Sequence, residues 1–192
     1  MSGDAEQQYL CDGLAEEIII ALSRIRALFV IARNSSFTYR GKEVDVRQIG
    51  RDALRKFRSA IALDPSFASP YGLASRCCNF RKAQGWMVDR MQKTAEAVGL
   101  ARKALELAKD DVVALSEAGY ALAYVGRDLD AAASALDRAI ELNPSSANSW
   151  HYRGMVGVWL GETLRTIEYV SRAMRLSPVD PLMYEMKSNI AC

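Results

Sequence analysis

The sequence predicts a mainly α-helical solenoid, preceded by a short segment of mixed α/β character. The first observation is an alanine followed five residues later by a proline, near the end of several predicted helices. The pairs are Ala60/Pro65, Ala139/Pro144 and Ala173/Pro178. The second observation is that the last two pairs lie 34 residues apart. A fixed period with helical content is typical of repeat proteins, in which each unit packs on its neighbours.

Before the repeats, the pattern predicts a helix, a strand and a second helix. Apolar residues three or four apart from Ala5 to Ile25 indicate an amphipathic helix. Leu28 to Ala32, "LFVIA", is short, unbroken and rich in β-branched residues, which suits a buried strand. After a loop rich in Asn and Ser, a helix is expected from about Asp45 to Leu63. Its apolar positions keep one face throughout, so we expect one continuous helix across the junction with the repeats.

Three helix pairs fit the repeated part of the chain. They are predicted at 66–82 with 88–108, at 112–125 with 129–142, and at 146–160 with 163–176. The loop of the first pair is longer than the others, because Ala60 and Ala104 are 44 residues apart, ten more than the period. "PLMYEMKSNIAC" then begins a further first helix.

Two positions within each unit carry the residue types that close helix packing requires. A bulky residue fills the space between paired helices, and a small residue four positions later lets the helices approach. These positions hold Tyr71 and Ser75, Leu115 and Gly119, and Trp150 and Gly154. Gly126 and Gly161 are expected to end their helices with a positive φ. With the period of 34 residues, this pattern resembles the tetratricopeptide repeat (TPR), which implies a TPR-type α-solenoid.

A second resemblance covers the start of the chain. It rests on Asp12–Glu16, Ala21–Ser23, Val30–Arg33, Ser35–Phe37 and Tyr39. These stretches are similar to the TolB-like module of many bacterial multidomain proteins. With the repeats, they look like the region that follows the catalytic domain in rhizobial-type class III adenylate/guanylate cyclases. The resemblance implies a truncated TolB-like segment at 1–52 and a TPR array at 53–192, with about three helix pairs and flanking half-repeats.

The resemblance implies the accessory region of such a cyclase and not its activity. The carboxylate pair that holds two metal ions in a cyclase domain, and its transition-state Arg and Asn, have no counterpart here. His151 is the single histidine, so no His-x-x-x-His pair exists and no Ser-His-Asp or Cys-His set is indicated. We therefore predict a protein that is not an enzyme, with no catalytic residues, cofactor or metal site.

Composition excludes further classes of function. Lys+Arg 25 against Asp+Glu 23 offers no basic stripe for nucleic acid. The longest apolar runs, Ile18–Leu22 and Ala27–Ala32, are far shorter than the roughly 20 residues of a membrane span. The polar start of the chain does not resemble a secretory signal. Four cysteines without a C-x-x-C spacing predict reduced thiols and a cytoplasmic location, with Cys77 and Cys78 packed as small apolar residues.

Repeat arrays of this kind bind extended peptides or helices in the groove lined by their first helices. Counting the positions that face this groove gives a candidate peptide site. Its residues are Arg76, Asn79, Ser116, Tyr120, Asn148, His151, Met155 and Val158. The set mixes polar and apolar side chains without a Lys/Arg cluster, which disfavours capture of a peptide carboxylate. His151 is expected either to contact a ligand in this groove or to be a plain surface residue. A second possibility is that the groove binds no specific ligand.

The most direct hypothesis is a TPR scaffold for protein–protein interaction, as the accessory or regulatory region of an adenylate cyclase-like signalling protein. The alternative is a truncated member of that family with little independent function. The expected partner is a protein or peptide, with neither nucleic acid nor membrane. Self-association through the carboxy-terminal helix is also predicted, because that helix is expected to expose Leu182, Met183, Tyr184 and Met186.

Overall fold

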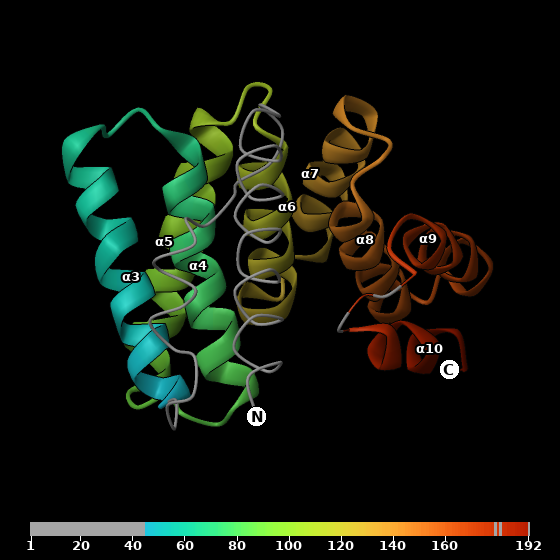
Figure 1. The fold of residues 1–192 in the computed structure, drawn as a ribbon, viewed down its shortest axis with the longest axis horizontal. Coiled ribbons are helices and arrows are strands. Elements are labelled where there is room, and N and C mark those ends of the chain that lie inside the picture. The colour runs from blue at the N-terminus through green and yellow to red at the C-terminus, as the bar shows by residue number, and fades with distance from the viewer. Residues whose placement is uncertain (1–44, 179, 181, 192) are drawn as a thin grey trace, which may run out of the picture. The chain divides into compact units, whose positions relative to one another are not determined.

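The computed structural model describes residues 45–178, 180 and 182–191, and throughout this part the regular elements are helices (Figure 1). They are α3 (Val46–Leu63), α4 (Ala68–Ala83), α5 (Arg90–Leu107), α6 (Val112–Ala121), the π-helical turn η1 (Leu122–Gly126), α7 (Leu129–Leu142), α8 (Ala147–Leu160), α9 (Thr163–Leu176) and α10 (Met183–Ala191). The predicted helix and strand of the TolB-like segment lie outside the described residues, and the predicted division at residue 52 stays a prediction.

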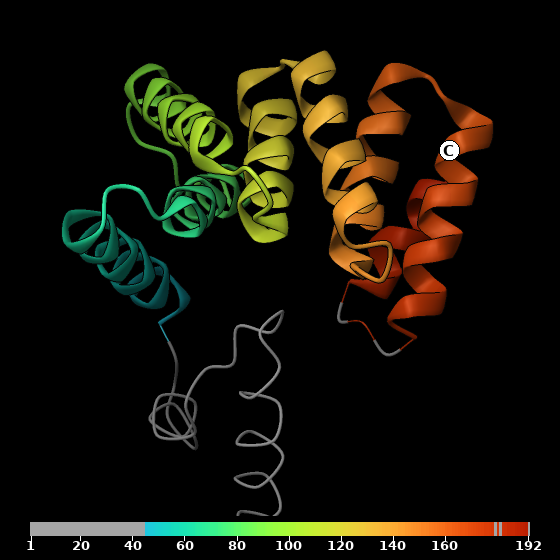
Figure 2. The same cartoon turned by 90° about the horizontal axis from the view of Figure 1, so that it is seen from above.

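The helices form consecutive antiparallel pairs in a TPR-like repeat fold. α4 packs with α5, α6 with α7, and α8 with α9, which confirms the three predicted pairs. Each first helix also packs on the first helix of the next pair, so α4, α6, α8 and α10 form one continuous layer. Figures 1 and 2 show the helices following one another in chain order from α3 to α10. This layer of first helices positions the candidate site.

The junction at the start of the array is one unbroken helix. α3 runs from Val46 to Leu63, within one residue of the predicted start, and from Arg47 onward it belongs to the same compact unit as the following helices. Gly50 lies within α3, where an added Cβ would meet nothing within 4 Å. Leu54 is the residue of α3 that is buried, with an exposed fraction of 7%. The apolar residues keep one helical face across the junction, and the helix is continuous there. The internal glycine costs about 1 kcal/mol and does not break it.

The core between repeats is built largely from alanine. Ala104, Ala139 and Ala173 are fully buried, at the positions where the sequence period places them. Leu122 and Leu136 fill the larger spaces between the helices. An alanine side chain lets two helices approach closely without leaving a void, and its burial costs no rotamer entropy. The recurring alanines at these three positions are therefore packing residues.

The glycine predictions are confirmed at three positions and wrong at one. A Cβ on Gly154 would lie 2.5 Å from Cγ2 of Val170, and one on Gly119 would lie 3.0 Å from Cγ of Leu136. Gly161 ends α8 with a φ of 75°. After α6, however, the positive φ of 61° belongs to Arg127 and not to Gly126. The π-helical turn η1 takes up one more residue per turn than an α-helix, so the left-handed position moves one residue along the chain.

Turn carboxylates and hydroxyls cap the first turns of successive helices. Asp111 accepts a hydrogen bond from the backbone N–H of Ala114 at the start of α6, and Asp128 accepts one from Ala131 at the start of α7. The carboxylates of "KDD" and "GRDLD" therefore act as helix caps. Each satisfies a backbone donor that the helix cannot pair internally.

The last helix differs from the prediction in one respect. Met186 is 1% exposed and packs against Val170 and Ala173 of α9, so the expectation that it is exposed is wrong. The reason is that α10 docks on the second helix of the preceding pair, which covers one of its faces. Tyr184 does lie on the exposed face of α10, with an exposed fraction of 67%.

Candidate functional site

A buried carboxylate connects three successive first helices. Glu117, on α6, is 3% exposed and accepts hydrogen bonds from Arg76 of α4, with an Nη1–Oε1 distance of 2.9 Å. From α8, Asn148 and Tyr152 also donate to it, each over 3.3 Å. Burial raises the pKa of Glu117, while the charge of Arg76 and the three donors act in the opposite direction. These hydrogen bonds hold α4, α6 and α8 at a fixed spacing within the layer of first helices.

A stack of aromatic rings lies beside this network. The ring of Tyr120 is parallel to that of Tyr152 within 8°, with 4.3 Å between the centroids. Tyr124, one turn further along, stacks on Tyr120 at 5.7 Å, and Trp159 of α8 approaches Tyr124 at 6.0 Å. Tyr120, Tyr124 and Trp159 are half-buried, so the stack is partly open to solvent. Stacked rings present a large apolar surface with little rotational freedom.

A cation extends the stack on the α4 side. Nζ of Lys82 lies 4.8 Å from the centroid of the Tyr124 ring and donates a hydrogen bond to the Tyr124 carbonyl. Burial lowers the pKa of Lys82, as does the charge of Arg127. We call the combined set the first-helix surface. It consists of Arg76, Lys82, Glu117, Tyr120, Tyr124, Asn148, Tyr152 and Trp159.

The structure brings three of the predicted groove residues together on this surface. Arg76 and Asn148 both donate to Glu117, and Tyr120 lies in the centre of the aromatic stack. Arg76 keeps 54% of its side chain exposed although its partner is buried. An exposed guanidinium anchored on a buried carboxylate is held in place and can still donate to a ligand.

The other predicted groove residues do not join the surface in the same way. Ser116 is buried and its hydroxyl lies 2.7 Å from that of Ser149. Asn79 is buried, and neither of its amide atoms has a hydrogen-bond partner among the described residues. Met155 is half-buried. Val158 instead lines a separate cavity of about 70 Å³ with Asn189 of α10.

The expectation that His151 is exposed on the groove or on the surface is wrong. Its side chain is 1% exposed, and its Nε2 has no hydrogen-bond partner in the described part of the chain. Burial lowers the pKa of His151, and the nearby charges of Glu185 and Asp180 oppose that shift. Both acids belong to the segment around α10, which packs on α8. The segment around α10 therefore covers His151, which α8 and α9 alone would leave exposed.

Sequence reasoning missed Lys82, Glu117, Tyr124, Tyr152 and Trp159. The predicted groove left out two positions of each repeat. One position holds Glu117 in α6 and Tyr152 in α8. The other holds Tyr124 and Trp159. A signal was present, because Phe80, Tyr124 and Trp159 occupy equivalent positions near the ends of three consecutive first helices. An aromatic residue at the same repeat position three times would have indicated a ligand-facing row.

The remaining chemistry of the described residues is limited. Cys77 and Cys78 are free thiols, and burial raises the pKa of Cys77 to about 11, which keeps it uncharged. No group of three or more His, Cys, Asp or Glu residues within the described ranges is placed to hold a metal ion. In that same part, no helix combines the length and apolar character needed to cross a membrane.

Comparison with known proteins gives one match in sequence and several in fold. The chain is 58% identical over 52 residues to "Putative adenylate cyclase 3" of Rhizobium meliloti (strain 1021). This match covers 27% of the chain and 9% of that protein, so the chain spans only a small part of its relative. No family model matches the sequence.

Solved structures resemble the chain in fold. Two crystal structures of MamA share 20% and 19% identity with it, with a TM-score of 0.52 for each. The first match includes 75% of this chain and 71% of the MamA chain. The second includes 78% of this chain and 82% of the MamA chain. A third structure is described as YrrB, a TPR protein with an unusual peptide-binding site, at 17% identity and a TM-score of 0.45, too low to support an argument. The chain thus has a TPR-like helical repeat fold and a short region similar to an adenylate cyclase.

Proposed function

We propose that the chain is a non-catalytic scaffold for protein–protein interaction, which binds an extended peptide across the first-helix surface. The observation that carries this proposal is the partly open stack of Tyr120, Tyr124 and Trp159 beside the anchored guanidinium of Arg76. Aromatic rings and arginine are the side chains that dominate binding energy at protein interfaces. The TPR-like fold supports the proposal, because arrays of this type offer one continuous layer of first helices.

The first-helix surface favours a peptide whose apolar side chains contact the aromatic stack and whose backbone carbonyls accept hydrogen bonds. The aromatic stack gives apolar contact that costs little side-chain entropy on binding. Arg76 and Lys82 supply donors at one edge, and Glu117 is buried and already accepts three hydrogen bonds. An acidic or carbonyl-rich segment fits that edge better than a basic one.

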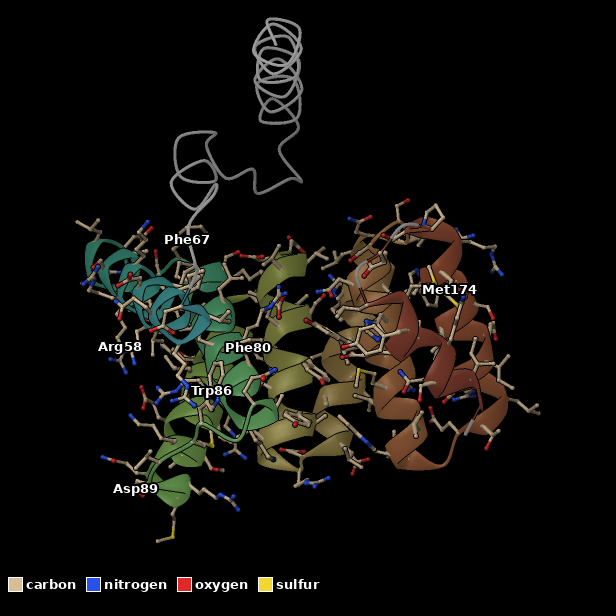
Figure 3. All side chains as sticks on the ribbon, turned by 60° about the horizontal axis from the view of Figure 1, so that its bottom comes forward. Arg58, Phe67, Phe80, Trp86, Asp89 and Met174 are labelled. Atoms are coloured by element: carbon tan, nitrogen blue, oxygen red, sulfur yellow. The ribbon has the colours of Figure 1, made fainter. Side chains whose placement is uncertain are left out.

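The test is a selection of peptides from a random library on the intact chain, followed by affinity measurements on the selected sequence. Tyr120→Ala removes the centre of the stack and should weaken binding about tenfold or more. Arg76→Gln should weaken it as well and leaves the aromatic core in place. Phe67→Ala is the matched control, because Phe67 is an exposed aromatic residue at the turn before α4 (Figure 3). Equal affinity of all three variants and the unaltered chain would overturn the proposal.

We further propose that this scaffold is the accessory or regulatory region of an adenylate cyclase-like signalling protein. The 58% identity to "Putative adenylate cyclase 3" supports this, although it covers a short region. The experiment is to mix the chain with the catalytic domain of that relative and to measure binding and the rate of cyclic nucleotide formation. Binding with a changed rate is the expected result. If neither binding nor a change in rate is found, the regulatory proposal fails while the scaffold proposal stands.

A further inference from the structure

An open cleft with a volume of about 500 Å³ lies between α3 and α4, away from the first-helix surface. Arg51, Arg55 and Arg58 of α3 line it together with Arg81 of α4, and the buried Leu54 forms its apolar floor. The volume is within the range of pockets that hold small ligands. Four arginines from two helices are thus gathered on one concave site.

The three arginines of α3 lie on one face of the helix. Their spacing of four and then three residues repeats with the helical turn, so Arg51, Arg55 and Arg58 form a row about 10 Å long. Arg58 extends from α3 toward α5, where it pairs with Glu96 (Figure 3). The row therefore spans a distance over which two or more phosphate groups can be contacted at once.

Among the described residues around the cleft, cations outnumber carboxylates even without Arg51, which donates to Oε1 of Gln48. Arg55 pairs with Asp52 at 3.1 Å, and Glu96 is shared between Arg58 and Lys93. Arg81 makes no ion pair with any residue in the described ranges. Four cations thus meet two carboxylates in this part of the structure.

The buried thiol of Cys78 lies within reach of the same charges. Burial raises the pKa of Cys78, and the charge of Glu96 adds to the shift, whereas Arg81, Lys93 and Arg58 oppose it. Arg58 and Lys93 both pair with Glu96, which places these two cations beside each other. Unbalanced cations this close repel each other, and an anion in the cleft would remove that cost.

We propose that this cleft binds a phosphate-bearing anion. A guanidinium presents two parallel N–H donors that match the oxygens of a phosphate group, and several guanidiniums can contact one phosphate from different sides. A carboxylate has two oxygens and a single charge, so one arginine fork satisfies it. The row on α3 with Arg81 opposite fits a group with more charges and more acceptor oxygens. The proposal is independent of peptide binding at the first-helix surface.

The test is calorimetric titration of the full chain with sodium tripolyphosphate, and in a second arm with a short phosphoserine peptide. Binding that weakens as salt is added is expected, because the contacts are ionic. The double variant R55Q/R81Q should lose roughly tenfold or more in affinity. It removes one arginine from each wall and keeps the pair between Arg58 and Glu96. The arm that binds more tightly identifies a free polyphosphate or a phosphorylated protein as the source of the anion.

The matched control is R138Q/R165Q, which removes the same charge from exposed arginines on α7 and α9. This control should bind as the unaltered chain does, and thermal melting should show that both double variants remain folded. If neither probe binds the unaltered chain, or if the two double variants bind equally well, the proposal is overturned.

Discussion

Glu117 is a carboxylate that accepts hydrogen bonds from both neighbouring first helices. Replacing it by alanine leaves Asn148 and the buried hydroxyl of Tyr152 without their partner. We expect Glu117→Ala to lower the free energy of unfolding by about 1–3 kcal/mol in urea denaturation. Glu141→Ala is the control, since Glu141 is exposed and its pair with Arg138 is at the surface. If the two variants were equally stable, the network would not hold the helices together.

The pH dependence of Glu117 follows from the direction of its shift. Its pKa is higher in the folded chain than in the unfolded one, so its stabilising contribution is full below about 4.5 and is lost as the pH rises through the folded pKa. The stability of the unaltered chain relative to Glu117→Gln should therefore fall as the pH is raised from 4 toward 7. Urea denaturation at several pH values measures this difference. A difference that grows over this range would contradict the assignment.

His151 gives a second pH prediction at the level of one residue. Burial lowers its pKa below 6.5, so its contribution to stability is present above that value and is lost as the pH falls through it. His151 is the single histidine of the chain, so its ring protons can be followed by NMR without ambiguity. The titration should give a midpoint below 6.5. A midpoint at or above that value would mean that the side chain is solvated or paired with Glu185.

At the scale of the helix pair, Gly154 sets how closely α8 and α9 approach. Its added Cβ would lie 2.5 Å from a methyl group of Val170, so Gly154→Ala should destabilise the fold by about 1–3 kcal/mol. Gly99 of α5 is the control, because a Cβ there meets nothing within 4 Å. Gly99→Ala should instead stabilise the helix by up to about 1 kcal/mol. Chemical denaturation of both variants tests the prediction, which fails if Gly154→Ala is neutral.

The sequence was informative about helices and less so about which residues their packing would cover. The repeat period, the alanine positions and the apolar phase are local signals, and they predicted the helix pairs and the continuous α3. His151 and Met186 were misjudged, because their burial depends on how α10 docks on α8 and α9. A single repeat carries no signal for such docking between units.

The candidate site shows the same division between local and long-range information. Arg76, Tyr120 and Asn148 were found because they occupy groove positions in each repeat. Glu117 and Tyr152 were missed because a buried carboxylate, with its donors on two other helices, is fixed by contacts 31 to 41 residues apart in sequence. Arg127 took the left-handed conformation expected of Gly126 because the π-helical turn changes the residue count.

At the scale of the whole molecule, self-association through α10 stays a prediction. Tyr184 is exposed on α10, and Leu164 is exposed at the start of α9. Exposed apolar side chains of this size are commonly covered by a protein partner, which can be a second copy of the chain. Analytical ultracentrifugation should show a concentration-dependent dimer that Tyr184→Asp shifts toward monomer. A monomer at all concentrations would reject the prediction.

The alternative that the chain is a shortened product with little independent function also belongs to this scale. A packed array with a buried alanine core should unfold as a unit, with a sharp transition. Thermal melting followed by circular dichroism distinguishes the two cases. A broad, non-cooperative transition would favour the shortened product and count against an autonomous scaffold.

If a peptide binds along the layer of first helices, hydrogen exchange of the complex will show where it lies. Amide protection should be compared between the free chain and the chain saturated with a peptide selected on it. We expect added protection in α4, α6 and α8, strongest around Tyr120, with α5, α7 and α9 unchanged. Protection confined to the second helices would contradict it.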